Sequence, residues 1–467
     1  MALAALYGVA HFSTPSPANA RVRVMEARRV DVVSSLVACP GAEMGGGATT
    51  RFGVVSPGAG SGAGRAEVRR AGAGGKRVAV LGRAGTGWFG DVTRPAEPLV
   101  VSGSGGLAAG LTSGQISVGK GGKGALSGTH CTRPATDSWF VGPGPEDGDL
   151  RLRVANPDDG PATVSVDVFS DVGELDESQA GAVFVPPHGS EVVSLATRAR
   201  GARLAALHVR TSMGRVSAAV EAAGKGKAGA DFVPGGSAPA TSLVVPGVPG
   251  GSGGRDLLLA APGDRDATVR VRAVTPNGTI VPGGDGVVQV PAGAVVPMPM
   301  DGMLSGRPCA LTLTSDVPVV AGLRARSSYS GGGDVAYTAA EPPLDGRGVA
   351  AVNRGDQGYQ ASVVLTALGG GVTARVSTET ARGTGSTKTV TIKSGRTMEV
   401  APPVPHGSAS GYGIAATRTS GTGRLYAARV LWRKVDGGKL LTLDPLESAA
   451  GTVPVYPANG SLGAVVR

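Results

Sequence analysis

The residues Leu150–Pro186, LRLRVANPDDGPATVSVDVFSDVGELDESQAGAVFVP, decide the fold, because the chain repeats them. Shifted along the chain without a gap, the stretch falls on Arg255–Pro291, RDLLLAAPGDRDATVRVRAVTPNGTIVPGGDGVVQVP. The tripeptide Ala-Thr-Val at 162–164 then coincides with the Ala-Thr-Val at 267–269. A looser third copy begins at Ser362 with SVVLTALGGGVTARV. The repeat predicts three related modules in one chain.

Polar and apolar residues alternate within the repeat, as in Thr163–Val168, and this pattern is typical of a half-buried antiparallel strand. Asn156–Gly160, NPDDG, has the composition of a tight turn. Short strands separated by a turn every eight to twelve residues or so indicate a β-sandwich. We therefore expect an all-β protein built from tandem immunoglobulin-like β-sandwich modules of about 100 residues each.

The repeat and the shifts in composition predict the domain order. Residues 50–133 are rich in glycine and contain only short apolar runs, so we interpret them as a degenerate first module. The complete prediction is a signal peptide or truncated membrane anchor at 1–20, a spacer at 21–49, the degenerate module at 50–133, β-sandwich modules at 134–235, 236–343 and 344–448, and a tail at 449–467.

The first twenty residues favour export. Met1–Ala10 is apolar, and Ala18-Asn19-Ala20 has the small-x-small form of a cleavage site, although no basic segment precedes the apolar stretch. Ten apolar residues are too few to span a bilayer, which takes about 20. The segment is therefore a minimal signal peptide or part of a longer signal or anchor. We expect an extracytoplasmic protein, secreted or held at the cell membrane by this segment.

The basic balance of the chain does not predict nucleic-acid binding. The net charge is +10, but the 45 Lys and Arg residues are scattered and never form a run of four. A solvated basic surface explains them, and the charge also permits binding to an anionic polymer.

The three cysteines are consistent with an oxidising compartment. Cys39 precedes the first strand-like run of the degenerate module, and Cys131 precedes the first strand of the next module. We predict a Cys39–Cys131 disulfide, which would tie the ends of the degenerate module together. Cys309 lies inside an apolar run and is predicted to be a buried, unreactive thiol. Metal-ligand spacings such as CxxC or HxxxH are absent from the sequence, so we predict no metal and no other cofactor.

Taken in order, these features resemble an actinobacterial family of unknown function, whose members are secreted or membrane-anchored and have an N-terminal hydrophobic segment. The matching features are Cys39-Pro40, the stretch SGTHC…SWFVGPG that ends at Gly144, the strand pair LRLRVANPDDGPATVSV and the turns VPPHG and VPAGA. The resemblance covers nearly the whole chain and implies no catalytic residues.

Two short motifs have the form of known sites but have simpler explanations. Gly250–Gly254, GGSGG, satisfies the GxSxG pattern of a hydrolase nucleophile, yet a strand-like run follows it where that motif requires a helix. Arg354-Gly355-Asp356 is the integrin-binding tripeptide, but it lies in a predicted loop that needs polar residues in any case.

The remaining candidates also favour a structural interpretation. The acidic stretch Glu146–Asp149 could hold Ca²⁺, although further ligands are not evident and a solvated turn is the simpler interpretation. His188 and His406 each lie in a Pro-His-Gly-Ser turn, which a repeated turn explains without catalysis. Trp139 and Trp432 lie in apolar strands, which favours core packing over sugar binding.

These observations favour a non-enzymatic extracytoplasmic scaffold or binding protein of the cell envelope. Its partner would be an unidentified envelope protein or a cell-wall polymer. The alternative is a protein that binds cell-wall carbohydrate or anionic polymer. A hydrolase on a β scaffold is the third and least favoured class, since no catalytic set is evident in the sequence.

Overall fold

The computed structural model describes residues 28–42, 48–57, 63–72, 74–92, 96–119, 125–175, 181–226, 228–404 and 411–455. These residues form strands and turns, with one short 3-10 helix, η3 (Pro145–Asp147), and no α-helix among them. The all-β prediction is thus confirmed.

The chain divides into two units, Val32–Gly451 and a second unit made of the two ends. In the second unit the described strands β1 (Arg28–Asp31) and β36 (Thr452–Val455) pair with each other. The predicted segment at residues 1–20 and most of the predicted tail lie outside the described residues.

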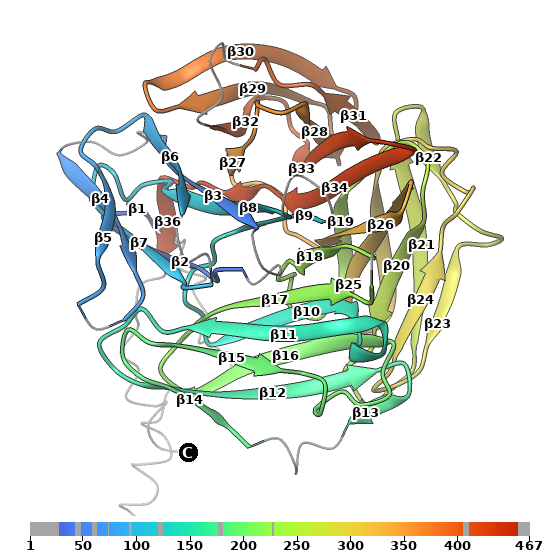
Figure 1. The fold of residues 1–467 in the computed structure, drawn as a ribbon. Helices are drawn as coiled ribbons and strands as arrows, with labels where there is room; N and C mark the ends of the chain where they lie inside the picture. Colours follow the sequence, from blue (N-terminus) through green and yellow to red (C-terminus); the bar gives the residue numbers. More distant parts are fainter. Residues whose placement is uncertain are drawn as a thin grey trace, which may run out of the picture. The chain divides into compact units, whose positions relative to one another are not determined.

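The first module is a complete sandwich of two four-stranded sheets (Figure 1). Its sheets have the orders β2-β7-β4-β5 and β6-β3-β8-β9. The strands are β2 (Ser34–Cys39), β3 (Thr49–Ser56), β4 (Gly64–Arg70), β5 (Arg77–Leu81), β6 (Thr86–Val92), β7 (Leu99–Gly105), β8 (Thr112–Val118) and β9 (Leu126–His130).

Strand β2 corrects the predicted spacer at 21–49. Its residues pair with β7, and Val37 and Cys39 are buried in the core of the first module. Val37 and Cys39 fill space between the two sheets, and that burial explains why the segment is a strand and not an extended linker. The module therefore begins near Ser34.

The second module contains the first copy of the repeat. Its sheets are β10-β16-β12-β13, with β14 also paired to β12, and β15-β11-β17-β18. Val164 and Leu152, one from each sheet, belong to one buried cluster. The strands are β10 (Asp137–Pro143), β11 (Gly148–Ala155), β12 (Ala162–Ser170), β13 (Gly173–Leu175), β14 (Val183–Val185), β15 (Ser190–Ser194), β16 (Leu204–Met213), β17 (Ser217–Gly224) and β18 (Ala230–Val233).

The third module repeats this order with one change. Its long strand β25 (Cys309–Tyr329) pairs with β19 and β21 in its first half and with β20 and β26 in its second half, so it serves both sheets. The other strands are β19 (Ala240–Val248), β20 (Arg255–Ala260), β21 (Ala267–Thr275), β22 (Gly278–Ile280), β23 (Val287–Val290), β24 (Val295–Pro299) and β26 (Gly332–Ala339).

The fourth module has the sheets β30-β29-β32-β27-β35 and β31-β28-β33-β34. Its strands are β27 (Arg347–Asn353), β28 (Tyr359–Leu368), β29 (Val372–Thr380), β30 (Gly383–Ile392), β31 (Arg396–Val400), β32 (Tyr412–Ser420), β33 (Arg424–Val435), β34 (Gly438–Pro445) and β35 (Glu447–Ser448). The looser third copy of the repeat therefore folds as the first two do.

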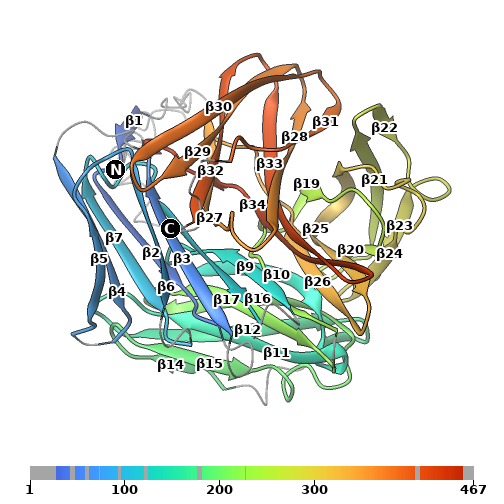
Figure 2. The same cartoon turned by 45° about the horizontal axis from the view of Figure 1, so that its top comes forward.

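The four modules meet through one strand each, which is the last strand of the sheet that contains it: β9, β18, β26 and β34. We call these four the last strands. Within the unit Val32–Gly451, β9 contacts β18, β18 contacts β26, β26 contacts β34 and β34 contacts β9 (Figure 1). Figure 2 shows β9, β26 and β34 from another side. These strands close a ring in which each module contacts both of its neighbours. The glycine-containing residues 224–226 and 330–331 precede two of these strands, β18 and β26. The buried side chains of Asp231, Asp334 and Arg429 lie on or beside these strands, and we call them the polar centre.

Candidate functional site: a pocket beside a buried polar centre

A cavity of about 630 Å³ lies between the second and third modules. The second module contributes η3, the start of β11 and the end of β17, and the third contributes the end of β25 and the start of β26. Pockets at the junction of two domains are common ligand sites, and this volume lies in their usual range of about 300–1,000 Å³. We call this cavity the junction pocket.

Two arginines of β25 fix the charged wall of the junction pocket. Arg324 contacts Asp147 of η3 at 3.0 Å and Asp256 of β20 at 3.1 Å. Arg326 contacts the same Asp256 at 3.0 Å. The pair formed by Arg324 and Asp147 joins the second module to the third directly. Because each guanidinium is held by a carboxylate, the wall is oriented before any ligand arrives.

Asp334 of β26 lies in the lining of the junction pocket and also belongs to the polar centre. Its side chain is buried, and its Oδ2 accepts hydrogen bonds from the backbone N–H of Leu441 (2.8 Å) and of Leu126 (3.4 Å). Its Oδ1 has no protein partner. Burial raises the pKa of Asp334 well above its ordinary value, and the neighbouring Asp231 raises it further. Asp334 thus joins three modules, and its burial favours the protonated form of its carboxyl group.

Asp231 of β18 makes an equivalent connection. Its Oδ1 accepts hydrogen bonds from the N–H of Gly128 in β9 and of Phe232, both at 2.8 Å. Burial raises the pKa of Asp231 well above its ordinary value, against the opposing effect of the Gly128 N–H. A Cβ at Gly128 would lie 3.0 Å from the Arg429 guanidinium and 3.2 Å from the Thr442 hydroxyl, so a larger residue there would have to displace one of them slightly. Both aspartates therefore accept backbone N–H groups offered by other modules.

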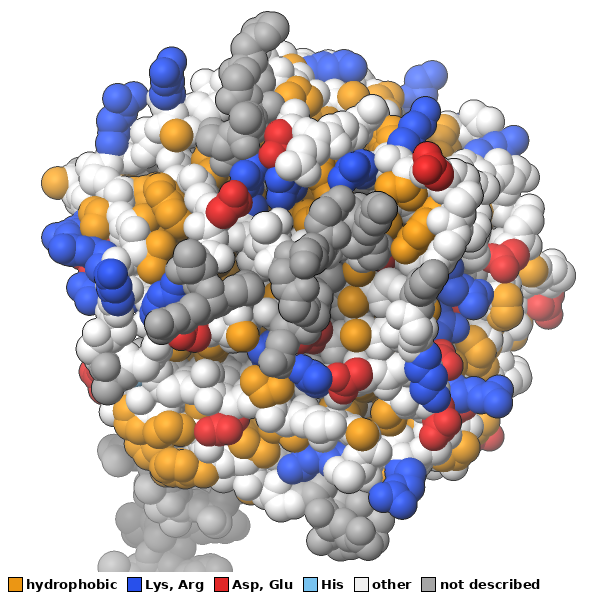
Figure 3. All heavy atoms as spheres, viewed as in Figure 1, with side chains coloured by type: hydrophobic (Ala, Val, Ile, Leu, Met, Phe, Trp, Pro, Cys, Tyr) orange, Lys and Arg blue, Asp and Glu red, His pale blue; other side chains and the backbone are white. Residues whose placement is uncertain are grey.

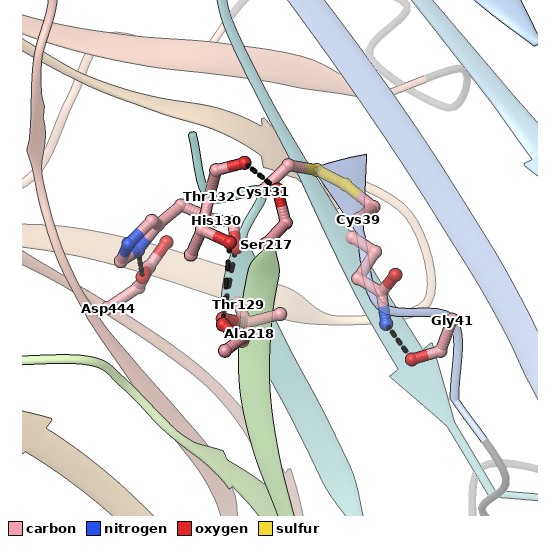
Figure 4. Close-up of a disulfide and its surroundings, with 10 residues drawn as sticks. Cys39, Gly41, Thr129, His130, Cys131, Thr132, Ser217, Ala218 and Asp444 are labelled. Atoms are coloured by element: carbon pink, nitrogen blue, oxygen red, sulfur yellow. Dashed lines mark hydrogen bonds and ion pairs between the residues drawn. A yellow bond between two sulfur atoms is a disulfide. The ribbon is translucent and has the colours of Figure 1, made fainter. Parts of the chain in front are cut away.

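A second set of charged groups continues from Arg429 towards the first module. Arg429 is buried and lies 3.8 Å from Asp444, whose other oxygen contacts Nδ1 of His130 at 2.8 Å (Figure 4). Burial alone would lower the pKa of His130, but the Asp444 carboxylate raises it to about 9. Burial raises the pKa of Glu341, which lies near His130, to about 8. At neutral pH the imidazole is therefore protonated and cannot accept a proton as a general base.

The structure brings Cys39 and Cys131 together in a disulfide, with their Cα atoms 4.2 Å apart (Figure 4). Cys39 ends β2 and Cys131 directly follows β9, so the bond joins the first strand of the first module to the residue after its last strand. Cys309 is a free, buried thiol. Burial raises the pKa of Cys309 to about 12, which keeps it protonated and unreactive.

The motifs noted in the sequence lie apart from the junction pocket, except for one. Ser252 of the GGSGG motif lies in the turn between β19 and β20, and a strand follows it. Arg354 is buried, and its guanidinium bonds Asp356 at 2.9 and 3.0 Å, so the tripeptide does not present its two charges to a partner. The acidic stretch Glu146–Asp149 is the exception, since it forms one wall of the pocket.

The histidine and tryptophan candidates are dispersed. His188 contacts the exposed Asp159 at 3.0 Å, and His406 lies outside the described residues. Trp139 is buried and stacks on His208, with 3.9 Å between ring centroids. Trp432 packs against the core of the third module. Among the residues that the structure describes, no group of three or more His, Cys, Asp or Glu side chains is arranged to hold a metal ion.

Sequence reasoning missed Asp231 and Asp334. The available signal was a carboxylate beside apolar residues in a last strand, Ala-Asp-Phe-Val at 230–233 and Asp-Val-Ala-Tyr at 334–337. The alternation of polar and apolar residues along a strand does not predict a buried charged residue. Such a residue indicates a hydrogen-bonding or charged partner elsewhere in the chain.

Comparison with known proteins places the chain in a family. A model described as a family of unknown function (DUF5719) matches residues 90–403, so the chain belongs to that family. No curated protein matches. No solved structure matches either.

Proposed function

We propose that this member of the DUF5719 family is a non-enzymatic, extracytoplasmic binding scaffold of the cell envelope. The junction pocket carries the proposal, because it is a preformed site between two modules whose charged wall is fixed by ion pairs. The ring of last strands supports a scaffold role, since it brings four sandwiches into direct contact.

Three observations support export and the absence of catalysis. The disulfide between Cys39 and Cys131 favours an oxidising compartment. The His130 imidazole is protonated at neutral pH, and the Cys309 thiol is buried and protonated. The described residues include no helix with the length and apolar character needed to cross a membrane. We propose that any membrane association is made through the apolar segment Met1–Ala10.

The visible surface argues against a site for polyanions. Lys and Arg side chains are spread over the face in Figure 3 and interleaved with Asp and Glu, so they form no continuous basic stripe on that face. Binding driven by net charge alone would be diffuse and strongly salt-dependent.

The test is a pull-down of the oxidised protein on purified cell-wall polymer at rising salt concentration. A binding scaffold with a defined pocket is expected to stay bound as salt increases, whereas charge-driven binding weakens. Absence of binding at every salt concentration would contradict the proposal. Labelling by a serine-directed activity probe would instead favour a hydrolase.

Export is tested separately. Residues 1–20 fused to a reporter that is active only outside the cytoplasm are expected to direct its export. A reporter that stays in the cytoplasm would contradict the predicted localisation. Mapping the true translation start then distinguishes a cleaved signal peptide from a longer membrane anchor.

A further inference from the structure

The charges in the lining of the junction pocket balance. The second module contributes the side chains of Glu146, Asp147, Asp149 and Lys225, and the third module contributes those of Arg324 and Arg326. The remaining ionisable carboxyl group of the lining, that of Asp334, is buried. Burial raises its pKa well above the ordinary value, which favours the uncharged form of this carboxyl group. Among the described residues of the lining, three acidic and three basic side chains therefore lie beside the buried Asp334.

This balance decides between the two kinds of wall polymer. A polyanion would gain from the three cations but would place its own charges beside three carboxylates, and like charges held close together oppose binding. A neutral ligand meets no such opposition. It can accept hydrogen bonds from the guanidinium groups and donate hydrogen bonds to the carboxylates.

The surface between the charged groups suits a ring that has both apolar and polar edges. Leu150, Val335 and Tyr337 lie in the lining, together with glycines such as Gly332 that leave space. Asp334, which is 1% exposed, has an Oδ1 atom without a partner. That atom is itself buried, so the accessible polar groups of the lining are the charged side chains named above, which can donate hydrogen bonds to ligand hydroxyl groups and accept them.

We infer that the junction pocket binds a neutral, hydroxyl-rich oligosaccharide of the cell wall rather than an anionic polymer. The inference rests on the proposed function, because it names the ligand class of the same site. The pocket volume of about 630 Å³ suits a short saccharide segment and is too small for a folded partner.

The test uses the full-length oxidised protein and a panel of soluble oligosaccharides. The panel contains neutral oligomers of N-acetylglucosamine, mannose, galactose and arabinose, with uronic acid and phosphorylated oligomers of matched length. Ala228→Trp places a large side chain at an exposed position in the lining, and Ala381→Trp makes the same change at an exposed turn of the fourth module. Glu146→Gln removes one charge and keeps the shape of its side chain.

We expect at least one neutral oligomer to bind the wild type and the Ala381→Trp variant, with affinity lowered about tenfold or more by Ala228→Trp. Glu146→Gln should weaken neutral binding less than the tryptophan does. Binding of anionic oligomers alone, neutral binding that Ala228→Trp leaves unchanged, or no neutral binding at all would overturn the inference. Continued salt-resistant binding of wall polymer in those cases would show that the proposed function stands and only the ligand class is wrong.

Discussion

The first and second modules share one strand order, yet they are held together by different means. The second module has a buried cluster of Val, Leu and Phe side chains drawn from both sheets. The described part of the first module has a smaller cluster, in which both disulfide cysteines are themselves buried members. A module that buries less apolar surface needs another source of stability, and a cross-link between its ends provides one. The comparison shows that one fold can be stabilised by apolar burial or by a covalent bond.

The largest effect should come from breaking the disulfide. Cys131→Ser is expected to lower the free energy of unfolding by about 4–5 kcal/mol, because it opens a loop whose ends are separated by 92 residues. Denaturant unfolding of the oxidised variant measures the change, with Cys309→Ala as the control. Peptide mapping without reduction should find residues 39 and 131 linked in the wild type. A free Cys39 or a bond to Cys309 would refute the predicted pairing.

The next effect concerns apolar burial in the modules without a disulfide. Val164→Asp and its repeat equivalent Val269→Asp are each expected to cost about 3–4 kcal/mol, since both side chains are fully buried and the new carboxylate has no partner. Val172→Asp is the matched control, because Val172 is 67% exposed. Stability equal to that of the control would mean that the inward face is wrongly assigned.

A smaller effect should follow from removing a carboxylate of the polar centre. Asp231→Ala leaves the N–H groups of Gly128 and Phe232 without their acceptor, which costs about 1–3 kcal/mol. Asp158→Ala breaks an ion pair with the exposed Arg215 and should cost well under about 1 kcal/mol. Equal losses in the two variants would show that the polar centre contributes no more than a surface contact.

Stability should also change with pH. The pKa of Glu341 is raised from 4.5 to about 8 and that of His130 from 6.5 to about 9, so the folded chain binds more protons than the unfolded chain in those intervals. The unfolding free energy should therefore fall as pH rises from about 4.5 to 9. Glu341→Gln is expected to flatten the part between pH 4.5 and 8, measured by denaturant unfolding at each pH. A free energy that rises over this interval in the wild type would contradict the assigned shifts.

The repeat predicted the sandwiches well because strand alternation and turn composition are local signals. Thr163–Val168 lies within β12 as expected, and its repeat equivalent lies within β21. The ring of last strands could not be predicted in this way. Glycine-rich stretches such as 224–229 are typical of linkers, and nothing local indicates that Asp231 accepts a hydrogen bond from Gly128, which lies 103 residues away. The lining of the junction pocket likewise combines residues of two modules, which only the assembled chain brings together.

The central claim is that the four modules within Val32–Gly451 form one cooperative body joined at the polar centre. Calorimetric unfolding of the oxidised full-length protein tests it most directly. The account predicts one transition with equal calorimetric and van't Hoff enthalpies, which Asp231→Ala shifts to lower temperature as a whole. Separate transitions for individual modules, or a shift confined to one of several transitions, would contradict it.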